Sequence, residues 1–174
     1  MPATVQLRVF HGASPGLGAD VTGDTLRFKR ADNDTQDAVD PVPIPASGDA
    51  YSWRKVVKLV ATTAPSNRLA NLRFFSGGES LGTGRTVLFS RTGSYVQPSI
   101  ADQDGPIGGT DVDDLTSGAP EVIQAGTFIS SGDSFPYDGG ALQDYVNLQM
   151  KLASNALAGA AAAAKTLTYR YDEA

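Results

Sequence analysis

The stretch YSWRKVVKLVATT, residues 51–63, is the longest alternation of apolar and polar residues in the chain and indicates its fold class. Side chains of a β-strand point alternately to the two faces of a sheet. A strand here would carry Trp53, Val57 and Leu59 on one face, and valines together with basic residues on the other. Because both faces contain apolar side chains, we expect this strand to lie centrally in a sheet or beneath a neighbouring element.

The same period of two recurs along the chain and predicts an all-β protein. Clusters such as Gly77-Gly78 and Gly82-Thr83-Gly84 separate the segments as turns. A chain of 174 residues suits a single domain over residues 1–174. The clearest predicted strands span residues 5–9, 26–29, 51–63, 69–76, 85–91 and 166–172, with weaker candidates at 42–45, 122–124 and 127–130. We therefore expect about eight strands in a β-sandwich or jelly-roll-like fold.

Residues 142–164 fit two patterns. Leu142, Val146 and Met150 follow helical spacing, and the segment is rich in good helix formers. Residues 146–152 also alternate strictly between apolar and polar, which in a helix would spread apolar groups around the whole surface. We interpret Tyr145–Ala153 as a strand and the Ala-rich stretch that follows as a connection or a short helical turn.

The composition excludes several functions. With no cysteine, the chain forms no disulfide framework, thiolate zinc site or Fe–S cluster, and it has no cysteine nucleophile. One histidine leaves no His-rich metal centre. A net charge of −5 argues against nucleic-acid binding as the main role, because phosphate binding needs a basic surface. We expect neither a cofactor nor a nucleic-acid partner.

The N-terminal residues and the hydropathy of the chain bear on where it folds. Residues 1–10 lack the basic start and apolar stretch of a secretory signal. No window approaches the roughly 20 apolar residues that cross a bilayer. We expect the protein to fold in a cytoplasm, without a membrane partner.

Charge is unevenly distributed along the chain. Residues 92–150 contain nine acidic residues and neither Lys nor Arg, and they are rich in Gly and Pro. Long irregular connections are usually functional loops or disordered segments. We interpret residues 92–141 as an extended acidic arm that contacts a basic surface of a neighbouring subunit; a solvated loop remains the alternative. The candidate interface residues are Asp102, Asp104, Asp111, Asp113, Asp114, Arg54, Lys58 and Arg73.

Catalytic signatures are weak. Gly12-Ala13-Ser14-Pro15-Gly16 formally matches the nucleophile elbow, which requires a strand before the serine and a helix after it. The residues that follow form no plausible helix, and His11 lies only three positions before Ser14. We therefore interpret the segment as a turn, assign no catalytic residue, and expect the protein not to be an enzyme.

Two sets of closely spaced aspartates are candidate calcium ligands. One set is Asp32, Asp34 and Asp37, and the second is the Asp102–Asp114 group. Neither follows the EF-hand pattern, which needs Gly at position 6 and Glu at position 12. We assign no metal ligand, although other loop geometries that bind calcium remain open.

Several segments resemble small structural proteins from the virions of tailed bacteriophages. They are SWRKVVKLV (52–60), APSN (64–67), NLRFF (71–75), YVQP (95–98) and the terminal LTYRYDE (167–173). The resemblance covers about half of the chain and includes no catalytic motif. It implies an all-β capsid cement or decoration protein, or a neck, tail or baseplate subunit. Such a protein assembles in the host cytoplasm, resides in the virion and binds copies of itself and other virion proteins.

A carbohydrate-binding β-sandwich module is the alternative from another functional class. Aromatic side chains such as Tyr95, Tyr137 or Trp53 could stack on a sugar, with calcium ordering the loops. Trp53, however, lies within an apolar strand and is expected in the core.

Overall fold

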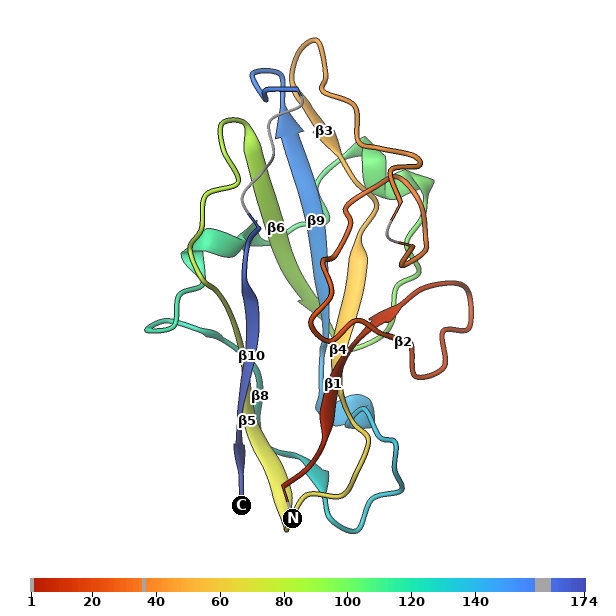
Figure 1. Cartoon of the computed structure of the whole chain (residues 1–174), viewed down its shortest axis with the longest axis vertical. Coiled ribbons are helices and arrows are strands. Elements are labelled where there is room, and N and C mark those ends of the chain that lie inside the picture. Colours follow the sequence, from red (N-terminus) through yellow and green to blue (C-terminus); the bar gives the residue numbers. More distant parts are fainter. Residues whose placement is uncertain (1, 36, 159–163) are drawn as a thin grey trace.

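Two antiparallel β-sheets packed face to face form the protein, as a computed structural model describes it for residues 2–35, 37–158 and 164–174 (Figure 1). The large sheet has the strand order β2-β1-β4-β9-β6-β7, with β3 also paired to β9, and the small sheet has the order β10-β5-β8. No helix in this part of the chain combines the length and the hydropathy needed to span a membrane. The strands are β1 (Val5–Phe10), β2 (Ala19–Asp20), β3 (Asp49–Tyr51), β4 (Lys55–Ala61), β5 (Arg68–Ser76), β6 (Arg85–Thr92), β7 (Thr110–Asp111), β8 (Glu121–Ser130), β9 (Tyr145–Ala153) and β10 (Leu167–Glu173); the short 3-10 helices are η1 (Ile100–Asp104), η2 (Val112–Asp114) and η3 (Gly140–Leu142).

The all-β, sandwich-like prediction is confirmed, with ten strands among the described residues instead of about eight. The ambiguous segment forms a strand with the predicted bounds, Tyr145–Ala153, and pairs with β6 from Tyr145 to Leu152. It lies between β4 and β6 in the middle of the large sheet. The Ala-rich stretch that was expected to be a connection or a helical turn falls largely on residues 159–163, outside the described residues.

The predicted strand over residues 51–63 is interrupted. β3 ends at Tyr51 and β4 begins at Lys55, and both pair with β9. Between the two strands, two backbone amides form hydrogen bonds with groups outside β9. Trp53 N–H donates to Lys29 O, and Arg54 N–H donates to the Asp102 carboxylate. Long-range partners for these two amides therefore break a strand that alternation alone predicted to be continuous.

Two predicted strands, at residues 26–29 and 42–45, do not form. Among the described residues this region contributes only an isolated bridge between Lys29 and Pro41. Pro41, Pro43 and Pro45 occur at alternate positions and lack the N–H group that a sheet ladder needs. The region is instead an irregular loop that lies over one end of the large sheet (Figure 1).

The main hydrophobic core lies between the two sheets. Val57 and Leu59 of β4 contribute to it from the large sheet, as the alternation predicted. Phe74 of β5 stacks on Phe89 of β6, with ring centroids 5.2 Å apart, and so joins the small sheet to the large one. Trp53 is only half-buried and does not belong to this core, contrary to expectation, because it lies in the interruption between β3 and β4.

A second apolar cluster covers the outer face of the large sheet. Phe10, Val56 and Val60 are fully buried there beneath Tyr95 and Tyr145. The Tyr145 ring meets Phe10 edge-on at 5.4 Å and lies 5.9 Å from the Tyr95 ring. Both faces of β4 are therefore buried, which confirms the prediction that this strand is covered on both sides.

The predicted acidic arm needs correction. Within residues 92–141, Thr110–Asp111 and Glu121–Ser130 are strands, and β8 is a full member of the small sheet. Ile123, Phe128 and Ile129 of β8 are buried in the main core. The pairing of β5 with β8 has three irregularities, one of them close to Gly126 with a φ of 92°. These bulges disturb the alternation that would have indicated a strand. Other parts of the segment, including residues 93–99 and 105–109, are irregular, as its Gly and Pro content suggested.

Candidate functional site

Of the residues predicted to form an interface, Arg54 and Asp102 come together within one chain. Asp102 belongs to η1, and its side chain is 3% exposed. Its Oδ1 accepts hydrogen bonds from Arg54 Nε at 2.9 Å and NH2 at 2.6 Å, and its Oδ2 accepts from the backbone amides of Arg54 and Ser99. The acidic segment therefore does meet a basic residue next to the sheet, at the interruption between β3 and β4, but within its own chain.

Lys58 also meets an acid of residues 92–141. Its side chain is 1% exposed, and its Nζ lies 3.3 Å from Asp138 Oδ2 and donates to Gly140 O at 2.9 Å. The same Nζ lies 4.2 Å from the centroid of the Tyr145 ring, which gives a cation–π contact. Burial lowers the pKa of Lys58, and the charge of Asp138 opposes that shift.

Gln149, which no sequence pattern identified, also holds residues 102–107 against the large sheet. It is completely buried on the outer face of the large sheet. Its amide group donates to Ser52 O, Asp102 O and Gly105 O, and its Oε1 accepts from Ile107 N–H. The only sequence feature that marks Gln149 is its polar side chain within the predicted strand 145–153. That feature does not indicate which groups Gln149 binds.

The remaining predicted interface residues lie apart. Asp111 is half-buried and caps η2 by accepting from Asp113 N–H, and Asp113 bonds with Lys165 and Ser76. Asp104 and Asp114 are exposed. Arg73 is half-buried on β5, and the described part of the chain gives it no ion pair. The predicted residues thus divide between intrachain contacts and separate surface positions and form no single patch.

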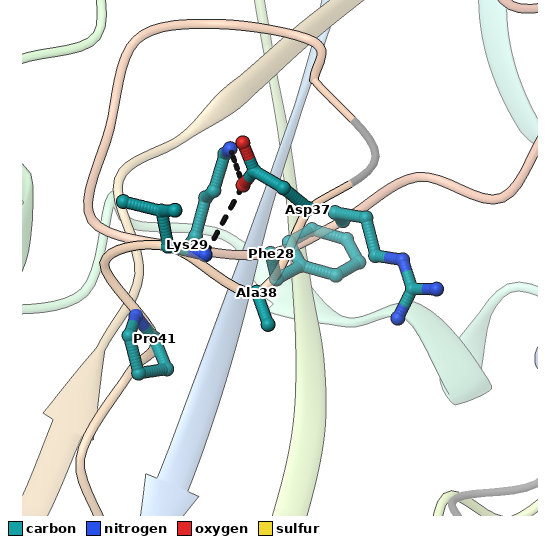
Figure 2. A pocket seen from close by; sticks show the side chains of 7 residues that line it. Phe28, Lys29, Asp37, Ala38 and Pro41 are labelled. Atoms are coloured by element: carbon teal, nitrogen blue, oxygen red, sulfur yellow. Dashed lines mark hydrogen bonds and ion pairs between the residues drawn. The ribbon is translucent and has the colours of Figure 1, made fainter.

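A pocket of about 220 Å³ opens in the irregular loop of residues 27–41 (Figure 2). Figure 2 shows Lys29 and Asp37 in contact, with Phe28, Ala38 and Pro41 around them. Lys29 Nζ donates to Asp37 Oδ1 at 2.7 Å, and Val39 N–H donates to the same oxygen. These two donors already share one carboxylate oxygen of Asp37. The pocket therefore presents mainly apolar surface, this paired charge and the side chain of Arg27.

A buried lysine lies next to this loop. Lys55 is 4% exposed, and its Nζ donates to Ala31 O and Asn33 O. Burial lowers the pKa of Lys55 to about 8, and the nearby charge of Lys29 lowers it further, whereas Asp32 and Asp34 oppose the shift.

This lowered pKa predicts a specific pH dependence of stability. Between about pH 8 and pH 10.5 the unfolded chain keeps a proton that folded Lys55 has released, so the free energy of unfolding rises with pH in this window. Relative to Lys55→Met, the wild type should gain about 2–3 kcal/mol between pH 7 and pH 10. Urea unfolding of both proteins at several pH values measures the difference; a difference that stays constant with pH contradicts the assignment.

His11 and Asp32, considered for catalysis and for metal binding, contact Asp34, Gly12 and Gln97. His11 Nε2 lies 3.5 Å from Asp34, and within the described residues no hydrogen bond joins His11 to the exposed Ser14. Asp32 accepts from Gly12 N–H and from Gln97. In the described ranges, no group of three or more His, Asp or Glu side chains has the geometry to hold a metal ion.

Two of the three aromatic residues considered for sugar stacking, Tyr95 and Tyr137, are engaged in packing. Tyr95 donates its hydroxyl to Gly12 O and packs against Tyr145, and burial raises the pKa of Tyr95 to about 12. Tyr137 packs against the main core while its backbone pairs with Ala61. These contacts use part of both ring surfaces and, for Tyr95, the hydroxyl group that a sugar platform would present.

The two sheets end differently, and this contrast defines the candidate functional surface. The large sheet ends in β2 and β7, which have two residues each. The small sheet ends in β8, with ten residues, and β10, with seven. A long strand edge presents unpaired N–H and C=O groups to which another chain can add a strand. No family model, no curated protein and no solved structure matches this chain.

Proposed function

We propose that this protein is a non-enzymatic structural subunit of a bacteriophage virion, in the role of a capsid cement or decoration protein. It acts through contacts with copies of itself and with other virion proteins. The observation that carries this proposal is the small sheet, whose two end strands are long and pair, among the described strands, with β5 alone. The resemblance of residues 52–60 and 167–173 to virion proteins supplies the biological setting.

The distribution of buried charge supports a rigid building block. Two buried ion pairs hold residues 92–141 against the large sheet: Arg54 with Asp102, and Lys58 with Asp138. The outer face of that sheet is therefore covered by its own chain, and the small sheet remains as the accessible part of the sandwich. A fixed surface suits assembly, because little conformational entropy is lost when a preorganised surface binds.

Quantitative mass spectrometry of purified virions tests the proposal. Particles from the phage that encodes this chain should contain it in many copies, in a fixed ratio to the major capsid protein. Particles assembled without it should release their genome at a lower temperature, and adding back the purified chain should reverse this loss. A few copies per particle would indicate a neck, tail or baseplate subunit, and complete absence from particles would reject the virion role.

A further inference from the structure

Strand β10 forms a regular free edge of the small sheet. It pairs with β5, and no other strand of the described chain pairs with it. The irregularity between these strands adds its extra residue to β5, since Arg170 pairs with Arg73 and Asp172 with Ala70. Asn71 in that bulge has a φ of 55°. β10 itself therefore keeps the even alternation that a further antiparallel strand requires. Figure 1 shows it in dark blue, running along the front of the small sheet.

The direction of its backbone groups follows from two contacts with β5. Arg68 and Ala174 exchange both N–H···O bonds, and Gly77 N–H donates to Thr166 O. Alternate residues of a strand direct N–H and C=O to the same side. The even-numbered residues of β10 therefore face β5, and the odd-numbered ones direct their backbone groups to the free edge. The latter are Leu167, Tyr169, Tyr171 and Glu173.

The side chains of β10 select one register for pairing with a second copy. An antiparallel two-fold axis at Arg170 or Asp172 would place like charges opposite each other, which destabilises cross-strand pairs. An axis at Tyr169 would place Arg170 opposite Thr168 and leave it without an acidic partner. An axis at Tyr171 places Arg170 opposite Asp172 of the second copy, twice, and aligns the two Tyr171 residues.

The positions of these side chains fit that register. Arg170 and Asp172 are exposed, and both lie on the outer face of the small sheet. Arg170 lies over the Phe75 ring at 5.6 Å, and Asp172 accepts from Asn71 Nδ2 at 2.7 Å, so each charge is held next to the edge. Residues that face each other without sharing backbone hydrogen bonds have their Cα atoms only about 4.5 Å apart, close enough for the two charges to pair.

We propose that two copies of this chain pair antiparallel along β10, with Tyr171 at the two-fold axis, and so join their three-stranded sheets into one continuous sheet. The paired edges place Tyr169 of each copy opposite Glu173 of the other, and all free backbone groups from residue 169 to residue 173 then find partners. The biological use of this contact rests on the proposed assembly function, since it is one way in which copies of a virion protein bind each other.

Charge reversal in the full chain tests the contact. Sedimentation equilibrium should show a monomer–dimer equilibrium for the wild type, and Arg170→Asp or Asp172→Arg should each raise the dimer dissociation constant at least tenfold, a change of about 1.4 kcal/mol. The combined exchange Arg170→Asp with Asp172→Arg restores opposite charges and should return the constant close to the wild-type value. Arg27→Asp, the same charge change at an exposed residue away from β10, should leave dimerisation unchanged.

Amide hydrogen exchange by NMR tests the strand register itself. On dimerisation, the amides of Tyr169, Tyr171 and Glu173 should become protected. Those of Thr168 and Arg170 should be protected in the monomer already. Protection that appears at β8 instead of β10 would overturn the proposal.

Three outcomes of sedimentation would also overturn the inference. They are a wild type that stays monomeric up to about 1 mM, a dimer that survives both single reversals, and a combined exchange that fails to restore dimerisation. The isolated chain is sufficient for these measurements. A dimer formed by a protein that is absent from virions therefore rejects only the proposed function, and a monomer found in virions rejects only the β10 contact.

Discussion

Asp102→Asn is expected to lower the free energy of unfolding by about 3–5 kcal/mol, the range found when one partner of a buried ion pair is removed. The carboxylate accepts four hydrogen bonds, three from Arg54 and one from the Ser99 amide. An asparagine side chain has one oxygen for these donors and directs an NH2 group at the rest. The guanidinium of Arg54, 18% exposed, would then lack its counter-charge.

Chemical denaturation measures this effect, and the chain contains a matched control. Asp104 lies two residues away, is exposed, and Asp104→Asn should change stability by at most about 0.5 kcal/mol. Hydrogen exchange should also show that residues 99–109 open more readily in Asp102→Asn than in the wild type. Equal stabilities of the two variants would contradict the buried role of Asp102.

Asp138→Asn is expected to destabilise the protein by about 3 kcal/mol, because it leaves the Lys58 ammonium buried without a counter-charge. The substitution keeps an oxygen for the Gly140 amide, which donates to Asp138 Oδ1, so the loss reports mainly on Lys58. Combining it with Lys58→Met should recover most of the stability, since apolar replacements of buried pairs are often neutral. Asp114→Asn, at an exposed aspartate, is the control.

The pH dependence of Asp138→Asn follows from the lowered pKa of Lys58. Burial lowers this pKa below its ordinary value of 10.5 and Asp138 raises it, so removal of the Asp138 charge lowers it further. Where the folded pKa lies below the unfolded one, stability increases as pH rises toward the unfolded value. The difference between wild type and Asp138→Asn should therefore shrink as the pH approaches 10.5. A difference that grows with pH would show that Lys58 is not the group concerned.

The strands that could be predicted are those in which side-chain alternation is uninterrupted. Tyr145–Ala153 alternates over most of its length, and Arg85–Thr92 places Val87 and Phe89 on one buried face. The two strands lie next to each other in the large sheet. β8 was recognised only as two weak fragments, because the bulges around Gly126 change which residues face the core. Residues 26–29 alternate without forming a strand, since the neighbouring prolines leave no partner with a complete set of N–H groups.

For residues 92–141, amino-acid composition predicts the kind of residue that they contact but not the chain to which that residue belongs. Their excess of acid and their lack of Lys and Arg correctly suggested that they meet basic residues, and these are Lys58 of β4 and Arg54, just before β4. The expected neighbouring subunit was wrong for both contacts, because charge complementarity along a sequence does not distinguish an intrachain from an interchain partner. The fold brings Asp102 and Asp138 over their own large sheet.

By itself, the sequence determined the all-β class, the main strands and the two-sided burial of β4, since each follows from local alternation of side chains along an extended backbone. Only the tertiary structure decided the partners of the buried charges, the interruption at residues 52–54 and the identity of the open edges. These features depend on which distant segments pair, and strand pairing is a long-range outcome of packing that no local pattern encodes.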